Sequence, residues 1–99
     1  MNTKEEYSSE ESFETDVLEM TGDMFTLIVW NDDVNTFDWV IKALMEICNH
    51  DKDQAEQCAM FIHFQGKYAV KHGDYDTLKP MCVAITDRGI NATVEELAS

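Results

Sequence analysis

Met-Phe-Thr-Leu-Ile-Val-Trp, residues 24–30, runs directly into the polar cluster Asn31-Asp32-Asp33. The run is rich in β-branched and aromatic side chains and is interrupted only by Thr26. A short apolar run of this composition, bounded by Asn and Asp, is typical of a buried strand. We therefore predict a buried strand that ends in a polar loop.

The composition limits the kind of partner that the protein can bind. The chain has 99 residues, 44% of them hydrophobic, which favours one domain with a single core. Its 20 acidic and 7 basic residues give a net charge of −13. Because phosphate groups bind to basic surfaces, this charge argues against nucleic acid and anionic membranes, and it favours a metal ion or a protonated amine. We also expect no membrane span and no signal peptide.

The acidic residues concentrate in the first part of the chain. Residues 1–23 contain eight acids and one lysine, a net charge of −7, and few apolar side chains. We expect a flexible acidic extension there, a compact domain over residues 24–95 and a short tail over residues 96–99. Two interpretations of the extension stay open: a solvating segment without a role, or a segment that engages a partner.

The three cysteines predict neither a disulfide framework nor a zinc site. Cys48, Cys58 and Cys82 are odd in number, lack CxxC spacing and fall on apolar helical stripes. We expect buried, unreactive thiols in a reducing cytoplasm.

Hydrophobic periodicity predicts five further elements after the first strand. We expect helices at about residues 36–48, 52–62 and 78–88, and strands at 67–71 and 90–94. The order is then β-α-α-β-α-β. The simplest packing is an α+β fold, a two-layer α/β sandwich in which three helices cover one face of a three-stranded antiparallel sheet.

Polar residues at the ends of these segments predict where the helices begin and end. Asn35 and Asp51 are expected to cap the first two helices. Thr77 is expected to cap the third, because Pro80 would then lie in the first turn, where no backbone N–H is needed. Gly89 is expected to end that helix.

The strongest candidate for chemistry is the cluster Asn31-Asp32-Asp33 at the end of the first strand. Two adjacent carboxylates repel each other unless a cation or a donor lies between them, so the cluster is suited to a metal ion or an ammonium group. His63 is the second candidate, near the end of an apolar helical segment. Plainer interpretations stay open for both, because Asn and Asp favour ordinary turns and a histidine often packs with one hydrogen bond.

Other site types fit the sequence poorly. The acidic stretches Asp51-Lys52-Asp53 and Asp32-Asp33-Val34-Asn35 lack the central glycine and the distal glutamate of a calcium loop. The serines stand only at positions 8, 9, 12 and 99, which argues against a serine triad. We expect no catalytic residue, no metal site and no cofactor.

Two motifs about thirty residues apart resemble those of the ClpS family of bacterial protease adaptors. They are Leu27-Ile28-Val29-Trp30-Asn31-Asp32-Asp33 and Ile62-His63-Phe64-Gln65-Gly66-Lys67, and the likeness covers about residues 24–95. The resemblance implies the same α/β sandwich and a protein that is not an enzyme. Such adaptors bind substrates through a destabilising N-terminal residue (Leu, Phe, Tyr or Trp) and hand them to a Clp-family AAA+ unfoldase of the ClpA or ClpC type.

The resemblance also implies roles for individual residues. It assigns the substrate α-amino group to Asn31, Asp32, Asp33 and His63. It assigns the hydrophobic pocket to Asn35, Phe37, Val40, Ala59 and Ile62, with Phe37 in place of the usual methionine at the rim. It assigns unfoldase docking to Asp74, Asp76 and Lys79. The expected partners are the N-terminal domain of the unfoldase and N-degron substrates, and the protein is expected to be a monomer.

Two alternatives to this interpretation stay open. The first is an acidic interaction domain of the same fold that modulates the unfoldase without binding degrons. The second is a divalent-cation protein that uses the acidic loop.

Overall fold

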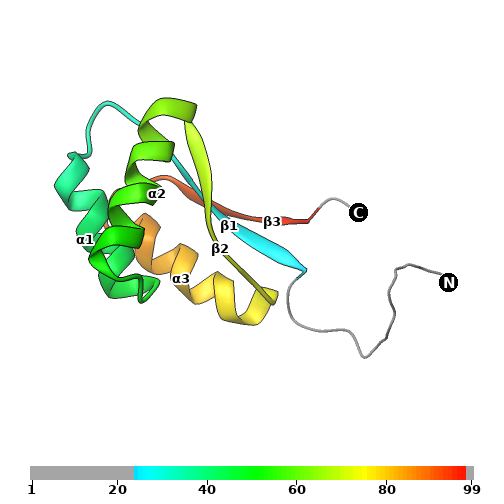
Figure 1. Cartoon of the computed structure of the whole chain (residues 1–99). Coiled ribbons are helices and arrows are strands. Elements are labelled where there is room, and N and C mark those ends of the chain that lie inside the picture. Colours follow the sequence, from blue (N-terminus) through cyan, green and yellow to red (C-terminus); the bar gives the residue numbers. More distant parts are fainter. Residues whose placement is uncertain (1–23, 98–99) are drawn as a thin grey trace, which may run out of the picture.

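The computed structural model describes residues 24–97 as three strands and three helices in the predicted order (Figure 1). The elements are β1 (Phe25–Trp30), α1 (Phe37–Ile47), α2 (Lys52–Gln65), β2 (Lys67–Gly73), α3 (Tyr75–Asp87) and β3 (Ala92–Glu96). The fold is α+β, as predicted. The acidic extension predicted over residues 1–23 lies outside the described residues.

The buried strand predicted at residues 24–30 is the centre of the sheet. β1 pairs antiparallel with both β2 and β3, so the strand order is β2-β1-β3. Trp30 faces Lys67 on β2, and Phe25 faces Glu96 on β3. Leu27 and Val29 are fully buried, which explains the apolar character of the run.

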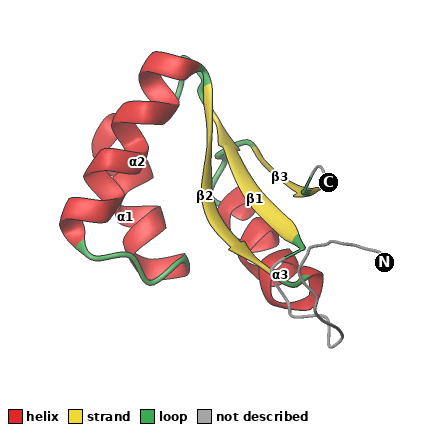
Figure 2. Cartoon of the chain, turned by 45° about the vertical axis from the view of Figure 1, so that its right-hand side comes forward, coloured by secondary structure: helices red, strands yellow, loops and turns green. Residues whose placement is uncertain are grey.

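The three helices lie on the same side of the sheet (Figures 1 and 2). α2 packs on β2, α3 packs on all three strands, and α1 packs on the other two helices. The core between the layers takes large side chains from every layer, such as Leu27, Leu44, Leu78 and Ile85. Burying such side chains is the main force that holds the layers together.

The start of α1 corrects one prediction. Thr36, not Asn35, is the N-cap, and its Oγ1 accepts a hydrogen bond of 3.1 Å from the backbone N–H of Trp39. The helix is therefore slightly shorter than the predicted 36–48. Both residues have side chains suited to capping, and the sequence pattern does not distinguish such neighbours.

α2 begins as predicted and continues further than predicted. Asp51 and Gln54 form the reciprocal capping box. The helix runs past the predicted end at residue 62 to Gln65, where Gly66 ends it in the left-handed conformation, with φ of 89°. β2 then continues through His72 to Gly73, two residues past the predicted end.

The start of α3 was predicted wrongly. The helix begins at Tyr75, and its cap is Asp74, which accepts a 2.9 Å hydrogen bond from the N–H of Thr77. Pro80 is then in the second turn rather than the first, so the helix forgoes one backbone hydrogen bond there. Gly89, with φ of 82°, follows the C-cap Arg88, in agreement with its predicted role.

The last strand lies later in the chain than predicted. β3 spans Ala92–Glu96 rather than residues 90–94. Ile90 is buried but lies in the connection from α3. The strand therefore includes Glu96, which was predicted to begin the C-terminal tail.

Candidate functional site

A pocket of about 330 Å³ lies between the loop after β1, the start of α1 and the end of α2. All nine residues predicted for the α-amino site and the hydrophobic pocket line it. They are Asn31, Asp32, Asp33, Asn35, Phe37, Val40, Ala59, Ile62 and His63, and Thr36 is the tenth. Residues that are about thirty positions apart in the sequence thus line one pocket.

The end of β1 is tied to the end of α2 by a backbone hydrogen bond. The N–H of Asn31 donates to the carbonyl of Gly66 over 2.9 Å. Gly66 is the cap of α2, and His63 lies in the last turn of that helix. This bond is one reason why the polar cluster after the strand and the imidazole line the same pocket.

Asp32 organises the loop that forms one wall. Its Oδ1 accepts hydrogen bonds from the backbone N–H groups of Val34 (2.9 Å) and Asn35 (2.7 Å). Its Oδ2 accepts a third from the side-chain Nδ2 of Asn35, at 2.7 Å. Hydrogen bonds from the backbone and side chain of Asn35 lower the pKa of Asp32 below the ordinary value of 3.8, so this carboxylate is charged at neutral pH.

Asn35 links this loop to the end of α3. Its Nδ2 also donates to the carbonyl of Gly89 over 2.8 Å. With both amide hydrogens used, Oδ1 is the atom of this side chain that can accept a further hydrogen bond. Asp33 differs from its neighbour Asp32. Within the described part of the chain, its carboxylate is exposed and accepts none of the hydrogen bonds that Asp32 accepts from the loop.

The opposite wall of the pocket is largely apolar but includes the imidazole of His63. Ala59, Ile62 and His63 share one face of α2, because residues three and four apart are neighbours on a helix. Ala59 and Ile62 are only 3% exposed. Val40 of α1 is half-buried against the core, and Phe37 is exposed at the first position of the same helix. The pocket therefore joins an apolar wall to a polar, acidic end.

Thr36 lines the pocket and was not among the predicted site residues. It lies between two residues that were predicted, and its side chain caps α1. Threonine is a common capping residue, so its position before α1 gives no signal for a binding site.

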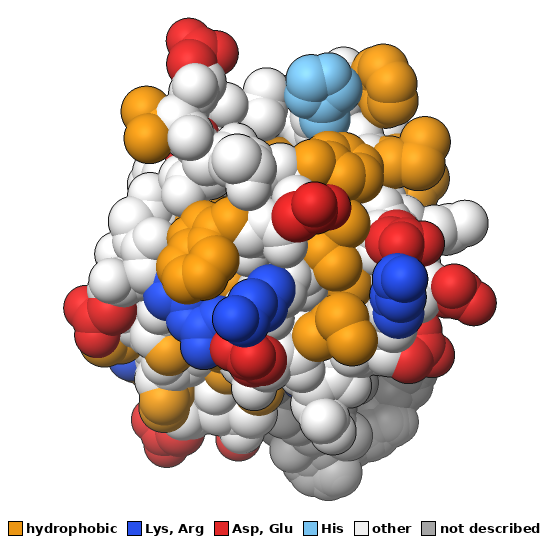
Figure 3. Space-filling view, turned by 90° about the vertical axis from the view of Figure 1, so that its left-hand side faces the viewer, with side chains coloured by type: hydrophobic (Ala, Val, Ile, Leu, Met, Phe, Trp, Pro, Cys, Tyr) orange, Lys and Arg blue, Asp and Glu red, His pale blue; other side chains and the backbone are white. Residues whose placement is uncertain are grey.

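Figure 3 shows the side of the molecule that carries α1 and α2. Near the top of this face a histidine lies among hydrophobic side chains, with acidic side chains nearby. His63 is exposed, and its ring makes an edge contact with Phe64 at 5.1 Å between centroids. The imidazole predicted as a ligand is thus accessible from solvent rather than packed in the core.

The three residues predicted to dock the unfoldase lie away from the pocket. Asp74, Asp76 and Lys79 are at the start of α3, all exposed. This end of α3 meets the start of β1, where the rings of Tyr75 and Phe25 are 5.5 Å apart, whereas the pocket lies beyond the end of β1. The carboxylate of Asp74 caps the helix, and hydrogen bonds from Thr77 lower its pKa.

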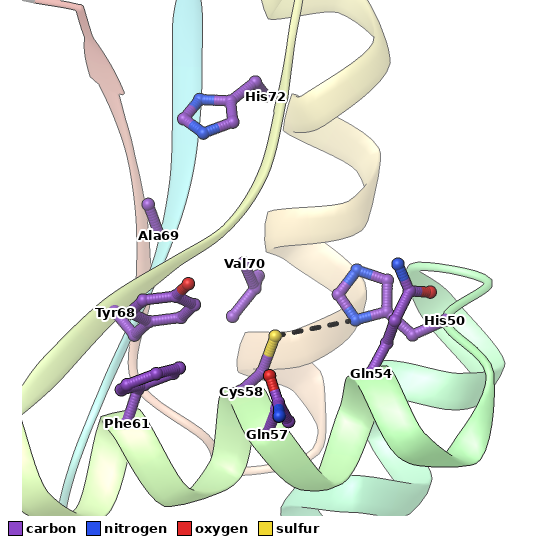
Figure 4. A pocket seen from close by; sticks show the side chains of 9 residues that line it. All are labelled: His50, Gln54, Gln57, Cys58, Phe61, Tyr68, Ala69, Val70 and His72. Carbon is purple, nitrogen blue, oxygen red and sulfur yellow. Dashed lines mark hydrogen bonds between the residues drawn. The ribbon is translucent and has the colours of Figure 1, made fainter.

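A second pocket of about 310 Å³ lies between α2 and β2 (Figure 4). The Cys58 sulfur is 3.9 Å from Nδ1 of His50, at the side of this pocket. Burial raises the pKa of the Cys58 thiol and lowers the pKa of His50, so both groups are held in their neutral forms. His50 is half-buried beside the thiol. Because both groups are neutral, the pair is poorly suited to nucleophilic chemistry.

The remaining thiols agree with the sequence-based expectation. Cys48 is fully buried, and burial raises its pKa to about 11. All three cysteines are free and buried.

Between residues 24 and 97, no three His, Cys, Asp or Glu side chains are grouped as a metal ion needs. No helix in that range is long and apolar enough to cross a membrane.

The sequence matches a protein-family model over residues 20–93, and that model is described as the ATP-dependent Clp protease adaptor protein ClpS. The chain belongs to the ClpS family. Its members are adaptors of the ATP-dependent Clp protease.

Curated ClpS proteins from two genera show how similar this sequence is to its relatives. The chain is 29% identical to the ClpS of Corynebacterium aurimucosum over 87 residues, which cover 88% of this chain and 78% of the relative. It is 42% identical to the ClpS of Campylobacter jejuni over 43 residues, which cover 43% of this chain and 45% of the relative.

A solved ClpS structure shares the fold. ClpS2 of Agrobacterium tumefaciens, bound to L-phenylalaninamide, superimposes with a TM-score of 0.66 at 18% identity. The match covers 77% of this chain and 99% of the other chain. The sandwich expected from the ClpS resemblance is therefore confirmed.

Proposed function

We propose that this ClpS protein binds substrates whose free N-terminal residue has a large apolar side chain and delivers them to a Clp-family AAA+ unfoldase. The observation that carries the proposal is the pocket itself. Acceptor groups of Asn31, Asp33 and His63 line it together with the apolar side chains of Val40, Ala59 and Ile62. At about 330 Å³ it is at the small end of ligand pockets, which are roughly 300–1,000 Å³.

The polar end suits an α-ammonium group. A free α-amino group has a pKa of about 8 and is mostly charged at neutral pH. It has three donors and no acceptor, so it needs three acceptors around it. The Asn31 Oδ1, the Asp33 carboxylate and an unprotonated ring nitrogen of His63 supply these, while the Asp32 charge adds to the local negative potential.

The apolar wall suits the first side chain. Burying one large apolar side chain contributes about 1.5–3 kcal/mol, and each hydrogen bond to a charged group contributes about 1.5–3 kcal/mol. After ordering costs are subtracted, these contributions are compatible with micromolar binding of a single residue. The structural neighbour was solved with L-phenylalaninamide, a small molecule that carries both a free amine and a phenyl group.

Delivery to the unfoldase is the second part of the proposal. The exposed charges Asp76 and Lys79 are at the end of the molecule away from the pocket, so the adaptor can hold a substrate and contact the unfoldase at the same time. Asp74 contributes by capping the helix that presents them.

A titration of matched peptides tests the proposal. Fluorescence anisotropy with a peptide that begins with Phe and carries a free amine is expected to give micromolar or tighter binding. The same peptide with an acetylated N-terminus loses the charge and two donors, so we expect its affinity to fall at least a hundredfold. Equal binding of the two peptides would contradict the proposal. Failure of both to bind, with unfoldase binding retained, would favour a modulator without degron binding.

A further inference from the structure

An exposed apolar surface lies on the outer side of α2, next to the proposed pocket. Met60, Phe61 and Phe64 form it, and we call these three residues the outer ledge. Phe64 is 75% exposed and Met60 is 49% exposed. With Gln57 and Gln65 they line a shallow hollow of about 250 Å³. Large apolar side chains gathered on one exposed surface commonly mark a binding site.

The outer ledge is continuous with the pocket. His63 lines the pocket, and its ring touches Phe64, the most exposed member of the ledge, at 5.1 Å between centroids. Because the His63 ring borders both the pocket and Phe64, a peptide that leaves the pocket over His63 meets the ledge.

One of the three ledge residues, Phe61, is fixed by a contact with β2. Phe61 stacks on Tyr68 of β2, with ring centroids 4.7 Å apart and an interplanar angle of 22°. A side chain fixed in this way loses little conformational freedom when a ligand binds, which favours affinity.

On the other side of the pocket, Val34 is 86% exposed and Phe37 is 44% exposed. Next to Phe37 come the charged Asp38 and then Trp39, whose indole is already engaged. Trp39 Nε1 donates to the carbonyl of Arg88 over 3.1 Å, and the Arg88 guanidinium lies 5.6 Å from the centre of the Trp39 ring. The ledge brings three large apolar side chains together around one hollow beside His63, so it offers a contact to an apolar side chain that leaves the pocket over α2.

We propose that the outer ledge binds an apolar side chain at the second or third position of the substrate, so that the adaptor reads more than the first residue. This inference rests on the proposed function of the pocket. It makes Phe64 and Met60 specificity-determining residues for substrates of the form Phe-apolar-apolar.

The test compares two peptides and a one-residue probe. The peptides begin Phe-Leu-Leu and Phe-Ser-Ser and are otherwise identical, and the probe is L-phenylalaninamide, which has no second residue. Wild-type protein is expected to bind the Leu peptide about tenfold more tightly, which corresponds to about 1.4 kcal/mol. Phe64→Ser and Met60→Ser are expected to reduce this preference to less than threefold without changing the affinity for L-phenylalaninamide.

Val83→Ser is the matched control, because Val83 is a 45% exposed apolar residue on α3, on neither the pocket nor the ledge. It should keep the tenfold preference. If L-phenylalaninamide binds but the two peptides bind equally to wild-type protein, the ledge proposal is wrong and the proposed function stands. If L-phenylalaninamide does not bind, the proposed function itself has failed. Self-association in sedimentation that Phe64→Ser abolishes, with no peptide preference, would assign the ledge to a second copy and overturn the proposal.

Discussion

At the scale of single residues, two adjacent acids have different environments. Asp32 accepts three hydrogen bonds within its own loop, whereas Asp33 is exposed. The ClpS resemblance predicted both as ligands of the α-amino group. These hydrogen bonds favour a positioning role for Asp32, and Asp33 is the carboxylate that we propose for the substrate. This difference could not be predicted from the pair Asp32-Asp33, because it depends on Asn35 and on Gly89, far along the chain.

Asp32→Asn is expected to destabilise the fold in a pH-dependent way. The new amide would set a donor against the Nδ2 of Asn35, and turning Asn35 over would set its oxygen against the carbonyl of Gly89. Because the pKa of Asp32 is lowered in the folded state, its contribution is fully present above about pH 4 and is lost as the pH falls through the folded value. Urea unfolding should therefore show a difference between wild type and variant at pH 7 that shrinks toward pH 3. A difference that stays constant with pH would contradict the assignment.

His63→Ala is expected to weaken binding of a Phe-initiated peptide about tenfold to a hundredfold, the loss of one hydrogen bond to a charged group. The side chain is exposed, so the unfolding midpoint should hardly change. Isothermal calorimetry on the variant measures the affinity, and His72→Ala, an exposed histidine on β2, is the control. An affinity within twofold of wild type would remove His63 from the site.

At the scale of elements, the turn that joins α2 to β2 sets the geometry of the pocket. Gly66 has φ of 89° and accepts the hydrogen bond from Asn31 through its carbonyl. An added Cβ would meet nothing within 4 Å, so the backbone conformation alone requires glycine.

Gly66→Ala is expected to lower the free energy of unfolding by about 1–2 kcal/mol, the cost of a left-handed residue with a side chain. Gly73→Ala is the control, since its φ is not positive and its Cβ would lie 3.7 Å from Leu78, an ordinary contact. Thermal unfolding compares the two variants. Equal stability of both would show that Gly66 is not conformationally required.

The sequence predicted which elements exist better than where they begin. The apolar run of β1 and the Asp51–Gln54 capping box are local patterns, and both were confirmed. The start of α3 was missed because Pro80 was assumed to need the first turn, whereas the packing of α3 on the sheet tolerates one missing hydrogen bond. The ends of β2 and β3 follow from their pairing with β1, which no local pattern shows.

At the scale of the whole molecule, the pocket and the predicted docking residues lie at opposite ends of β1. The motif resemblance predicted every residue of the pocket except Thr36. The residues alone gave only the acidic cluster and His63, because an apolar residue such as Ala59 or Ile62 has the same pattern in a core as in a pocket wall. Their common position became apparent only with the packing of α2 beside the loop after β1.

Exchanging the charges at the start of α3 should separate the two halves of the function. The double variant Asp76→Lys with Lys79→Glu is expected to weaken binding to the N-terminal domain of the unfoldase at least tenfold, because it reverses the pattern of exposed charges. Affinity for the Phe peptide should stay within twofold, since the pocket is remote. Surface plasmon resonance measures both. Loss of peptide binding together with unfoldase binding would contradict two separate sites.

The most direct measurement is a crystal structure of the protein with a peptide that begins with Phe and has a free amine. The account predicts the ammonium nitrogen within hydrogen-bond distance of Asn31, Asp33 and His63, with the phenyl ring against Val40 and Ile62. A peptide bound elsewhere, or bound in this pocket with its amine directed to solvent, would contradict it.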